Sequence, residues 1–311
     1  METLNSRLIK FAILISLQIP SIICYIASIH NILSNRNNLK ALHNHGPLLL
    51  LFVGIITVMF DLSMILDFLR TGVVNPTIDG YCRMWIFFDM LLYAIVCVLM
   101  LWISIERYIL IFHYRKFFDT QQKRLLIHYF PFIIIFVYLI SFYIYGAFIY
   151  PCENKFDYHF VICGSLCFAF DNHILGLFDQ FVNSLIPSLL IIFVNIGLWF
   201  RIFWQKHYRM RKVMEWRRHR KIIIQFIPVA ILYMSGYLAY GSLQCYHMIY
   251  DPTNLSTIIQ QLYFFYLFHL VGLLHPFICL IGMPAVYRKW LPKRDRHVSP
   301  AIINQTNSIN R

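Results

Sequence analysis

The sequence predicts an all-α membrane protein, folded as a seven-transmembrane-helix bundle with its N-terminus outside the cell. Hydrophobic residues make up 59% of the 311 residues and charged residues only 13%, whereas a soluble domain has about 25% charged residues. The hydrophobic residues form seven runs of about 20 residues or more, each long enough to cross a bilayer. Lysine and arginine cluster on one side of these runs, and this bias sets the orientation.

Each run predicts one helix, and the chain has no linker rich in Pro, Gly or Ser, so we expect a single domain over residues 1–311. The first run is longer than a signal-peptide core and lacks a convincing cleavage site, which indicates a retained helix. A short amphipathic eighth helix is expected inside at about 284–292, before a cytoplasmic tail at 293–311. The seven membrane helices are expected at about 8–33, 47–70, 81–112, 125–149, 173–204, 221–248 and 258–282.

The basic residues explain the net charge of +13. That charge is compatible with nucleic-acid binding, but the basic residues lie in short segments between apolar runs. Acidic lipid headgroups and a cytosolic partner are therefore the expected counterparts, and no nucleic acid is expected. Of the 27 lysine and arginine residues, only five fall outside the predicted cytoplasmic side: Arg7, Lys10, Arg70, Arg83 and Lys155.

Three acidic residues, Asp61, Asp89 and Asp179, interrupt the apolar runs. A charge within a membrane helix is costly and usually faces the protein interior, where it serves a function. Asp89 and Arg107 are 18 residues apart, about five helical turns, so they lie on one face of the third helix. We therefore expect this helix to be central in the bundle.

The eight cysteines fall into two groups. One group lies within the apolar runs and is expected to consist of free, buried thiols: Cys24, Cys97, Cys245 and Cys279. The other group lies on the outer side, where disulfides form: Cys82, Cys152, Cys163 and Cys167. Four cysteines allow three pairings, and the sequence does not choose among them. A bond from Cys82 to Cys163 or Cys167 would tie the loop 150–172 across the mouth of the bundle.

The third run carries the motif that points to a family. Cys82 stands at its start and Glu106-Arg107-Tyr108 at its end, 25 residues separating the cysteine from the arginine. With seven helices and the N-terminus outside, this arrangement resembles a rhodopsin-like (class A) G-protein-coupled receptor. Pro276 in the seventh run, followed by a short basic segment, also matches the family.

The resemblance covers about residues 8–292 and is strongest to divergent orphan receptors of invertebrates. It implies a multi-pass protein of the plasma membrane that transmits an extracellular small-molecule or peptide signal to a cytosolic heterotrimeric G protein. It implies no enzymatic activity and no cofactor. The sequence departs from the family at four places. The Cys-Trp-x-Pro motif of the sixth helix and the tryptophan of the fourth helix are absent, and the other two departures concern the core of the bundle. No acid stands near Gly54–Ile56, and the Asn-Pro-x-x-Tyr motif begins His275-Pro276, so the family's sodium site is not expected here.

The resemblance assigns activation to Glu106, Arg107, Tyr108 and Pro276. Arg107 is expected to pair with Glu106 and to release it on activation, a role that suits a guanidinium because it stays charged and donates in a fixed fork. The alternative is an ordinary interfacial arginine that extends to the lipid headgroups. The basic segment 205–220 is expected to meet the G protein, or to anchor in headgroups.

The resemblance also suggests a ligand site. Asp89 lies at the position where amine receptors carry an aspartate, and His269 at the position of the tyrosine that bonds it. We therefore expect Asp89 and His269 to face each other and to bind a cationic amine or a basic peptide. The alternative is a structural pair without a ligand. Asp179 and Asn183 share a helix face four residues apart and are further candidates. The alternative is that Asp179 lies at the helix end among headgroups or pairs with a neighbour.

Other classes of protein are less consistent with the sequence. A transporter would show inverted repeats or broken helices, and an intramembrane hydrolase would show closely spaced zinc ligands within one helix. Neither signal is found, so no metal site is expected. A light-driven opsin needs a lysine in the seventh helix, and residues 258–282 contain none. Asn254-Leu255-Ser256 fits a glycosylation acceptor on the outer side.

Overall fold

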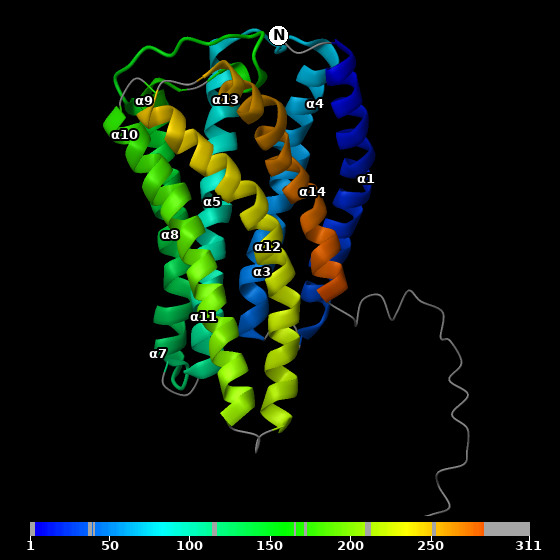
Figure 1. Ribbon diagram of the computed structural model, residues 1–311, viewed down its shortest axis with the longest axis vertical. Helices are drawn as coiled ribbons and strands as arrows, with labels where there is room; N and C mark the ends of the chain where they lie inside the picture. Colours follow the sequence, from blue (N-terminus) through cyan, green and yellow to red (C-terminus); the bar gives the residue numbers. More distant parts are fainter. Residues whose placement is uncertain are drawn as a thin grey trace, which may run out of the picture.

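The computed structural model describes residues 4–36, 39, 41–113, 117–164, 166–170, 173–208, 213–250 and 253–282. It confirms the all-α bundle: in this part of the chain, seven long helical segments pack side by side (Figure 1). The predicted eighth helix and the cytoplasmic tail lie outside the described residues. Five stretches of the described chain, which begin at Leu4, Leu42, Asp79, Gln121 and Ile174, are long and apolar enough to cross a membrane.

The first segment is α1 (Leu4–Ser34) and the third is α5 (Asp79–Phe112); both are uninterrupted helices. The second consists of η1 (Leu42–Asn44), α3 (His45–Ile56), η2 (Thr57–Asp61) and α4 (Leu62–Thr71). The fourth consists of α7 (Gln121–Arg124), η3 (Leu125–Tyr129), α8 (Phe130–Ile144) and η4 (Tyr145–Ile149).

The fifth segment consists of α10 (His173–Phe178), η6 (Asp179–Leu185) and α11 (Ile186–Tyr208). The sixth is α12 (Val213–Ile249), and the seventh consists of α13 (Asn254–Ile259), η7 (Gln260–Phe264) and α14 (Phe265–Gly282). Between the fourth and fifth segments, the loop contains η5 (Val161–Cys163) and α9 (Cys167–Phe170). Figure 1 shows this loop at the same end of the bundle as the N-terminus, which is the outer end.

Helix α5 is central, as the charged positions within it predicted. It packs against α3, α8 and α11, and its buried side chains extend from Cys82 and Trp85 at the outer end to Glu106 and Arg107 at the inner end. Large apolar side chains on the outer faces of the peripheral helices remain exposed in the bundle, among them Ile19. In a membrane these faces contact lipid, which is as apolar as they are.

Two π-helical turns position acidic side chains. Asp61 ends η2 and Asp179 begins η6, and both side chains are buried. A π turn contains one more residue than an α turn, so the side chains after it are rotated about the helix axis. Such turns are frequent at functional sites. Sequence periodicity based on 3.6 residues per turn does not detect them.

The seventh segment is tied to the first at Pro276. A proline within a helix has no N–H to donate to the carbonyl four residues earlier, which here belongs to Gly272. The Tyr25 hydroxyl donates to that carbonyl instead, at 2.8 Å, and Ser21 Oγ donates to the carbonyl of Leu273 at 2.9 Å. Two α1 side chains therefore satisfy the backbone around this proline.

Two disulfides hold the outer loop. Cys82 pairs with Cys163, and Cys152 pairs with Cys167, so the structure selects Cys163 from the two partners that the sequence left open. The first bond fastens the loop to the start of α5, and the second closes a turn within the loop. Of the four thiols expected to be free and buried, Cys97, Cys245 and Cys279 are buried, whereas Cys24 is only half-buried.

Backbone and side-chain contacts fix the loop further. The amide of Val74 donates to the carbonyl of Tyr158 at 2.8 Å, and the Tyr158 hydroxyl donates to the Asp79 carboxylate at 2.5 Å. This hydrogen bond raises the pKa of the Tyr158 phenol, because deprotonation would remove the donor. The loop is thus held over the bundle mouth by more than its disulfides.

Candidate functional site

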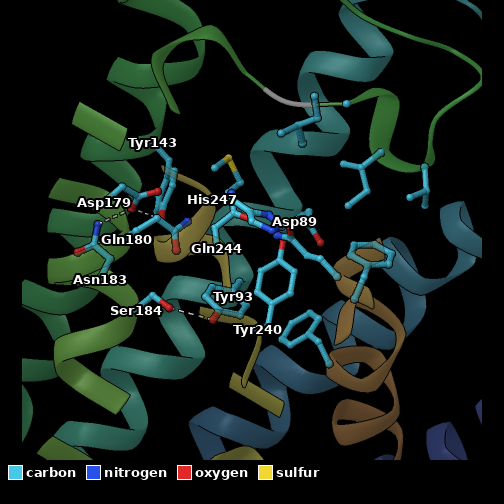
Figure 2. Close-up of a pocket in the computed structure, with 18 of the residues that line it drawn as sticks. Asp89, Tyr93, Tyr143, Asp179, Gln180, Asn183, Ser184, Tyr240, Gln244 and His247 are labelled. Carbon is cyan, nitrogen blue, oxygen red and sulfur yellow. Dashed lines mark hydrogen bonds between the residues drawn. The ribbon is translucent and has the colours of Figure 1, made fainter. Parts of the chain in front are cut away.

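The outer half of the bundle encloses a cavity of about 500 Å³. Its walls come from α5, η6, α12 and the seventh segment, and residues 160–162 and 164 of the outer loop also line it. The Cys82–Cys163 disulfide therefore holds the loop where it forms one wall of the cavity. Figure 2 shows Asp179 on one side of the cavity and Asp89 on the other.

The Asp179 side is a closed hydrogen-bond network. Asp179 Oδ1 accepts a hydrogen bond from the Tyr143 hydroxyl at 2.6 Å and another from Asn183 Nδ2 at 2.8 Å (Figure 2). The Tyr138 hydroxyl donates to Asn183 Oδ1 at 3.0 Å. Asp179 and Asn183 share one face and line the cavity, as the spacing suggested, but one carboxylate oxygen of Asp179 is already engaged by protein donors.

Aromatic rings form the deeper part of the cavity. Tyr93 stacks on Tyr237 with centroids 4.5 Å apart and packs against Phe268 at 5.2 Å. The Tyr93 hydroxyl forms a 2.9 Å hydrogen bond with Ser184 Oγ (Figure 2). Tyr240 packs edge-on against Tyr93 and also lines the cavity. These rings offer negative π faces next to the two carboxylates.

The structure brings Asp89 and His269 together, with Asp61 as a third member. One ligating atom from each of the three side chains lies within 4.8 Å of the other two. His269 Nδ1 is 3.6 Å from Asp61 Oδ2, and Trp85 Nε1 donates to Asp61 Oδ1 at 3.1 Å. Asp61 and His269 are buried, while Asp89 is half-buried and lines the cavity.

Sequence reasoning missed several features of the cavity. It treated Asp61 as a separate acid and did not find the polar side chains of Gln180, Gln244, His247 and Gln260, which also line the cavity. Elsewhere on the seventh segment, Tyr263 is 67% exposed, and the Lys10 ammonium lies 4.0 Å from the ring centroid of Tyr266.

At the inner end, Glu106 contacts a histidine from the fourth segment. Glu106 Oε1 contacts His128 Nδ1, and both side chains are buried. His128 Nε2 in turn lies 2.7 Å from His45 Nδ1, and His45 Nε2 lies 2.6 Å from the carbonyl oxygen of Leu39. The contact with His128, which links α5 to the second and fourth segments, was not predicted from the Glu106-Arg107 motif.

The other activation candidates also lie at helix contacts. Arg107 is buried. The Tyr108 hydroxyl accepts a hydrogen bond from the Arg201 guanidinium, which also stacks over the Phe112 ring at 4.4 Å. Pro276 is the buried proline at the contact of α14 with α1. The expected amphipathic helix and the side chains of 205–220, which were expected to meet the G protein, lie outside the described residues.

Comparison with known proteins agrees with this arrangement. A family model described as the 7 transmembrane receptor (rhodopsin family) matches residues 50–278, which is well over half of the chain. No curated protein sequence matches the chain. With the seven-helix bundle, the disulfide between α5 and the outer loop and the enclosed outer cavity, the match places the chain in the rhodopsin family of G-protein-coupled receptors, multi-pass proteins of the plasma membrane.

Proposed function

We propose that this receptor recognises a small ligand with a positive charge, an amine or the basic group of a peptide, and passes the signal to a heterotrimeric G protein. The observation that carries the proposal is the position of Asp89, a half-buried carboxylate on the wall of the cavity. Within the described residues, no lysine or arginine forms an ion pair with it. A carboxylate in low dielectric needs a partner, and a ligand cation supplies one.

The size and lining of the cavity support a small ligand. A volume of about 500 Å³ lies within the range of roughly 300–1,000 Å³ typical of small-molecule sites. Tyr93 and Tyr240 line the cavity with aromatic faces that attract cations. Asp179 lies on the opposite side with Tyr143 and Asn183 as donors, so it is suited to orient a polar group of the ligand.

Signal transmission follows from the position of Asp89 in α5. The same helix carries Glu106 and Arg107 at its inner end, so a ligand that pulls on Asp89 acts on the element that ends at the cytosolic surface. Glu106 bridges to the fourth segment through His128. A change in the rotation or tilt of α5 would break this contact and expose the inner surface to a G protein, which is the kind of two-state element that a switch requires.

The test is a screen of monoamines and of amidated basic peptides against cells that express the receptor, followed by dose–response curves for variants at matched surface expression. Losing one partner of a buried charged contact costs roughly 2–5 kcal/mol. Asp89→Asn should therefore raise the half-maximal dose of a cationic agonist at least about tenfold, roughly 1.4 kcal/mol. His269→Phe should have a smaller effect, because it changes the surroundings of Asp89 and leaves the Asp89 carboxylate in place.

Asp67→Asn is the matched control, because it removes a carboxylate near the outer end of α4 that pairs with Arg70 and does not line the cavity. If Asp89→Asn leaves the half-maximal dose of every active cation unchanged, Asp89 is structural and the charge argument is wrong. If only uncharged compounds activate the receptor, the same conclusion follows.

A further inference from the structure

We propose that Asp61, Asp89 and His269 form a binding site for a divalent transition-metal ion of the zinc type, at the wall of the cavity that carries Asp89. The three residues come from three different helical segments, so the site exists only in the folded bundle. The inference goes beyond ligand recognition, because a metal at this site would act as a second ligand of the receptor. It does not depend on the identity of the agonist.

The spacing of the ligand atoms suits such an ion. Zinc is bound at roughly 2.0–2.2 Å by histidine nitrogen and carboxylate oxygen in tetrahedral geometry, which places two ligands about 3.3–3.5 Å apart. His269 Nδ1 and Asp61 Oδ2 are already 3.6 Å apart. Asp89 completes a set whose members all lie within 4.8 Å of one another. Small side-chain rotations are enough to close this set on an ion.

The rest of the protein leaves these atoms without hydrogen-bond partners. Both ring nitrogens of His269 are buried and make no hydrogen bond in the described structure, and Asp61 Oδ2 has no hydrogen-bonding neighbour there apart from the Asp89 carboxyl. Each residue is only 2% exposed, and a buried polar atom without a partner is costly. A bound metal ion would satisfy Asp61 Oδ2 and one nitrogen of His269 at once.

The surroundings orient the ligands. Trp85 Nε1 donates to Asp61 Oδ1 at 3.1 Å, which fixes the carboxylate and leaves Oδ2 directed at His269. Hydrogen bonds of this kind to a ligating carboxylate are typical of metal sites. The Phe265 ring packs edge-on against His269 with centroids 4.8 Å apart and holds the plane of the imidazole.

The ligand set discriminates between metals. One imidazole and two carboxylates match the mixed nitrogen and oxygen ligands of zinc, whereas calcium and magnesium require six or more oxygen ligands. Two carboxylates would balance the double positive charge of the ion. Because Asp89 also lines the cavity, an ion can enter from the outer side, and water or a ligand group can occupy the remaining coordination position.

The experiment measures zinc binding to the purified receptor in detergent, without any agonist, by equilibrium dialysis and metal analysis. The wild type should bind one equivalent of Zn²⁺ that excess Mg²⁺ or Ca²⁺ does not displace. Asp61→Asn, Asp89→Asn and His269→Phe should each weaken this site by at least about tenfold. Asp179→Asn and His247→Gln, which alter a carboxylate and a histidine of the same cavity outside the triad, should leave it unchanged.

His269→Cys separates a lost ligand from a lost fold. A thiolate replaces the imidazole as a ligand, so this variant should still bind zinc and should gain preference for Cd²⁺, a softer ion. The proposal is overturned if the wild type shows no saturable zinc site tighter than about 100 µM. It is also overturned if the triad variants bind zinc like the wild type, or if monodisperse His269→Cys protein binds neither zinc nor cadmium.

Discussion

Tyr25→Phe tests the contact between α1 and α14 with the removal of a single oxygen atom. The Tyr25 hydroxyl donates to the carbonyl of Gly272 at 2.8 Å and lies 3.2 Å from His275 Nδ1. Pro276 cannot supply the N–H that would otherwise bond the Gly272 carbonyl. Tyr25 is 0% exposed, and phenylalanine fills nearly the same space, so the substitution removes the hydrogen bonds and leaves the packing.

The expected loss of stability follows from those partners. A buried acceptor left without its donor costs about 1–3 kcal/mol. His275 keeps its second contact, between Nε2 and Cys279 Sγ at 3.2 Å, so most of the cost falls on the Gly272 carbonyl. We therefore expect a loss of about 1–3 kcal/mol in the free energy of unfolding, which lowers the unfolding midpoint by about 1.5–4.5 °C for a chain of this size.

The assay uses the receptor's own thiols. Cys97, Cys245 and Cys279 are buried, so a thiol-reactive fluorescent dye reports their exposure as purified receptor is heated in detergent. Tyr263→Phe is the control, because Tyr263 belongs to the same helical segment as Gly272 but is 67% exposed. Equal midpoints for the two variants would refute the assignment of the Tyr25 hydroxyl as the donor that replaces the missing N–H.

Three further predictions concern topology, the outer loop and the inner contact. Mass spectrometry should find sugar on Asn254 and none on Asn304, which begins a second acceptor motif, Asn304-Gln305-Thr306, in the predicted cytoplasmic tail; the reverse would invert the orientation. Cys82→Ala should reduce surface expression or ligand binding, because the loop loses its bond to α5, and a free Cys82 thiol in folded wild-type protein would contradict this. His128→Phe removes the partner of Glu106 and should raise basal signalling in a G-protein reporter assay; unchanged or lower basal signalling at equal expression would count against a restraining role.

The membrane-spanning parts of the helices could be predicted from hydrophobic runs, and the basic segment 205–220 indicated that the fifth and sixth helices extend beyond their runs, but the runs alone did not give the full lengths. The sixth run predicted a helix over 221–248, whereas α12 extends from Val213 to Ile249. An apolar run measures the thickness of the membrane. The helix continues into the cytosol because residues such as Arg217, Arg218 and Lys221 are good helix formers. Outside the membrane, a helix does not need apolar side chains.

The candidate site also has a part that the sequence predicts and a part that only the structure shows. That Asp89 and Asp179 point into the bundle follows from the cost of exposing a charge to lipid. That Asp61 meets His269, or that Glu106 meets His128, depends on how each helix is rotated about its axis. The π turns η2 and η3 change that rotation, and no periodicity in the sequence marks them, so these contacts became visible only in the folded structure.

The contact between Gly54 and Tyr25 explains why this chain lacks the acid that the family carries in the second helix. The family places an acid near Gly54–Ile56, and this chain has none. A Cβ on Gly54 would lie only 2.4 Å from the Tyr25 hydroxyl, so any larger residue there would displace Tyr25 from the Gly272 carbonyl. The missing acid and the histidine before Pro276 are therefore linked through Tyr25, which fills the space beside Gly54 and contacts His275. At the place where the resemblance implies a sodium site, Tyr25 and His275 form a hydrogen-bond network that joins α1 to α14.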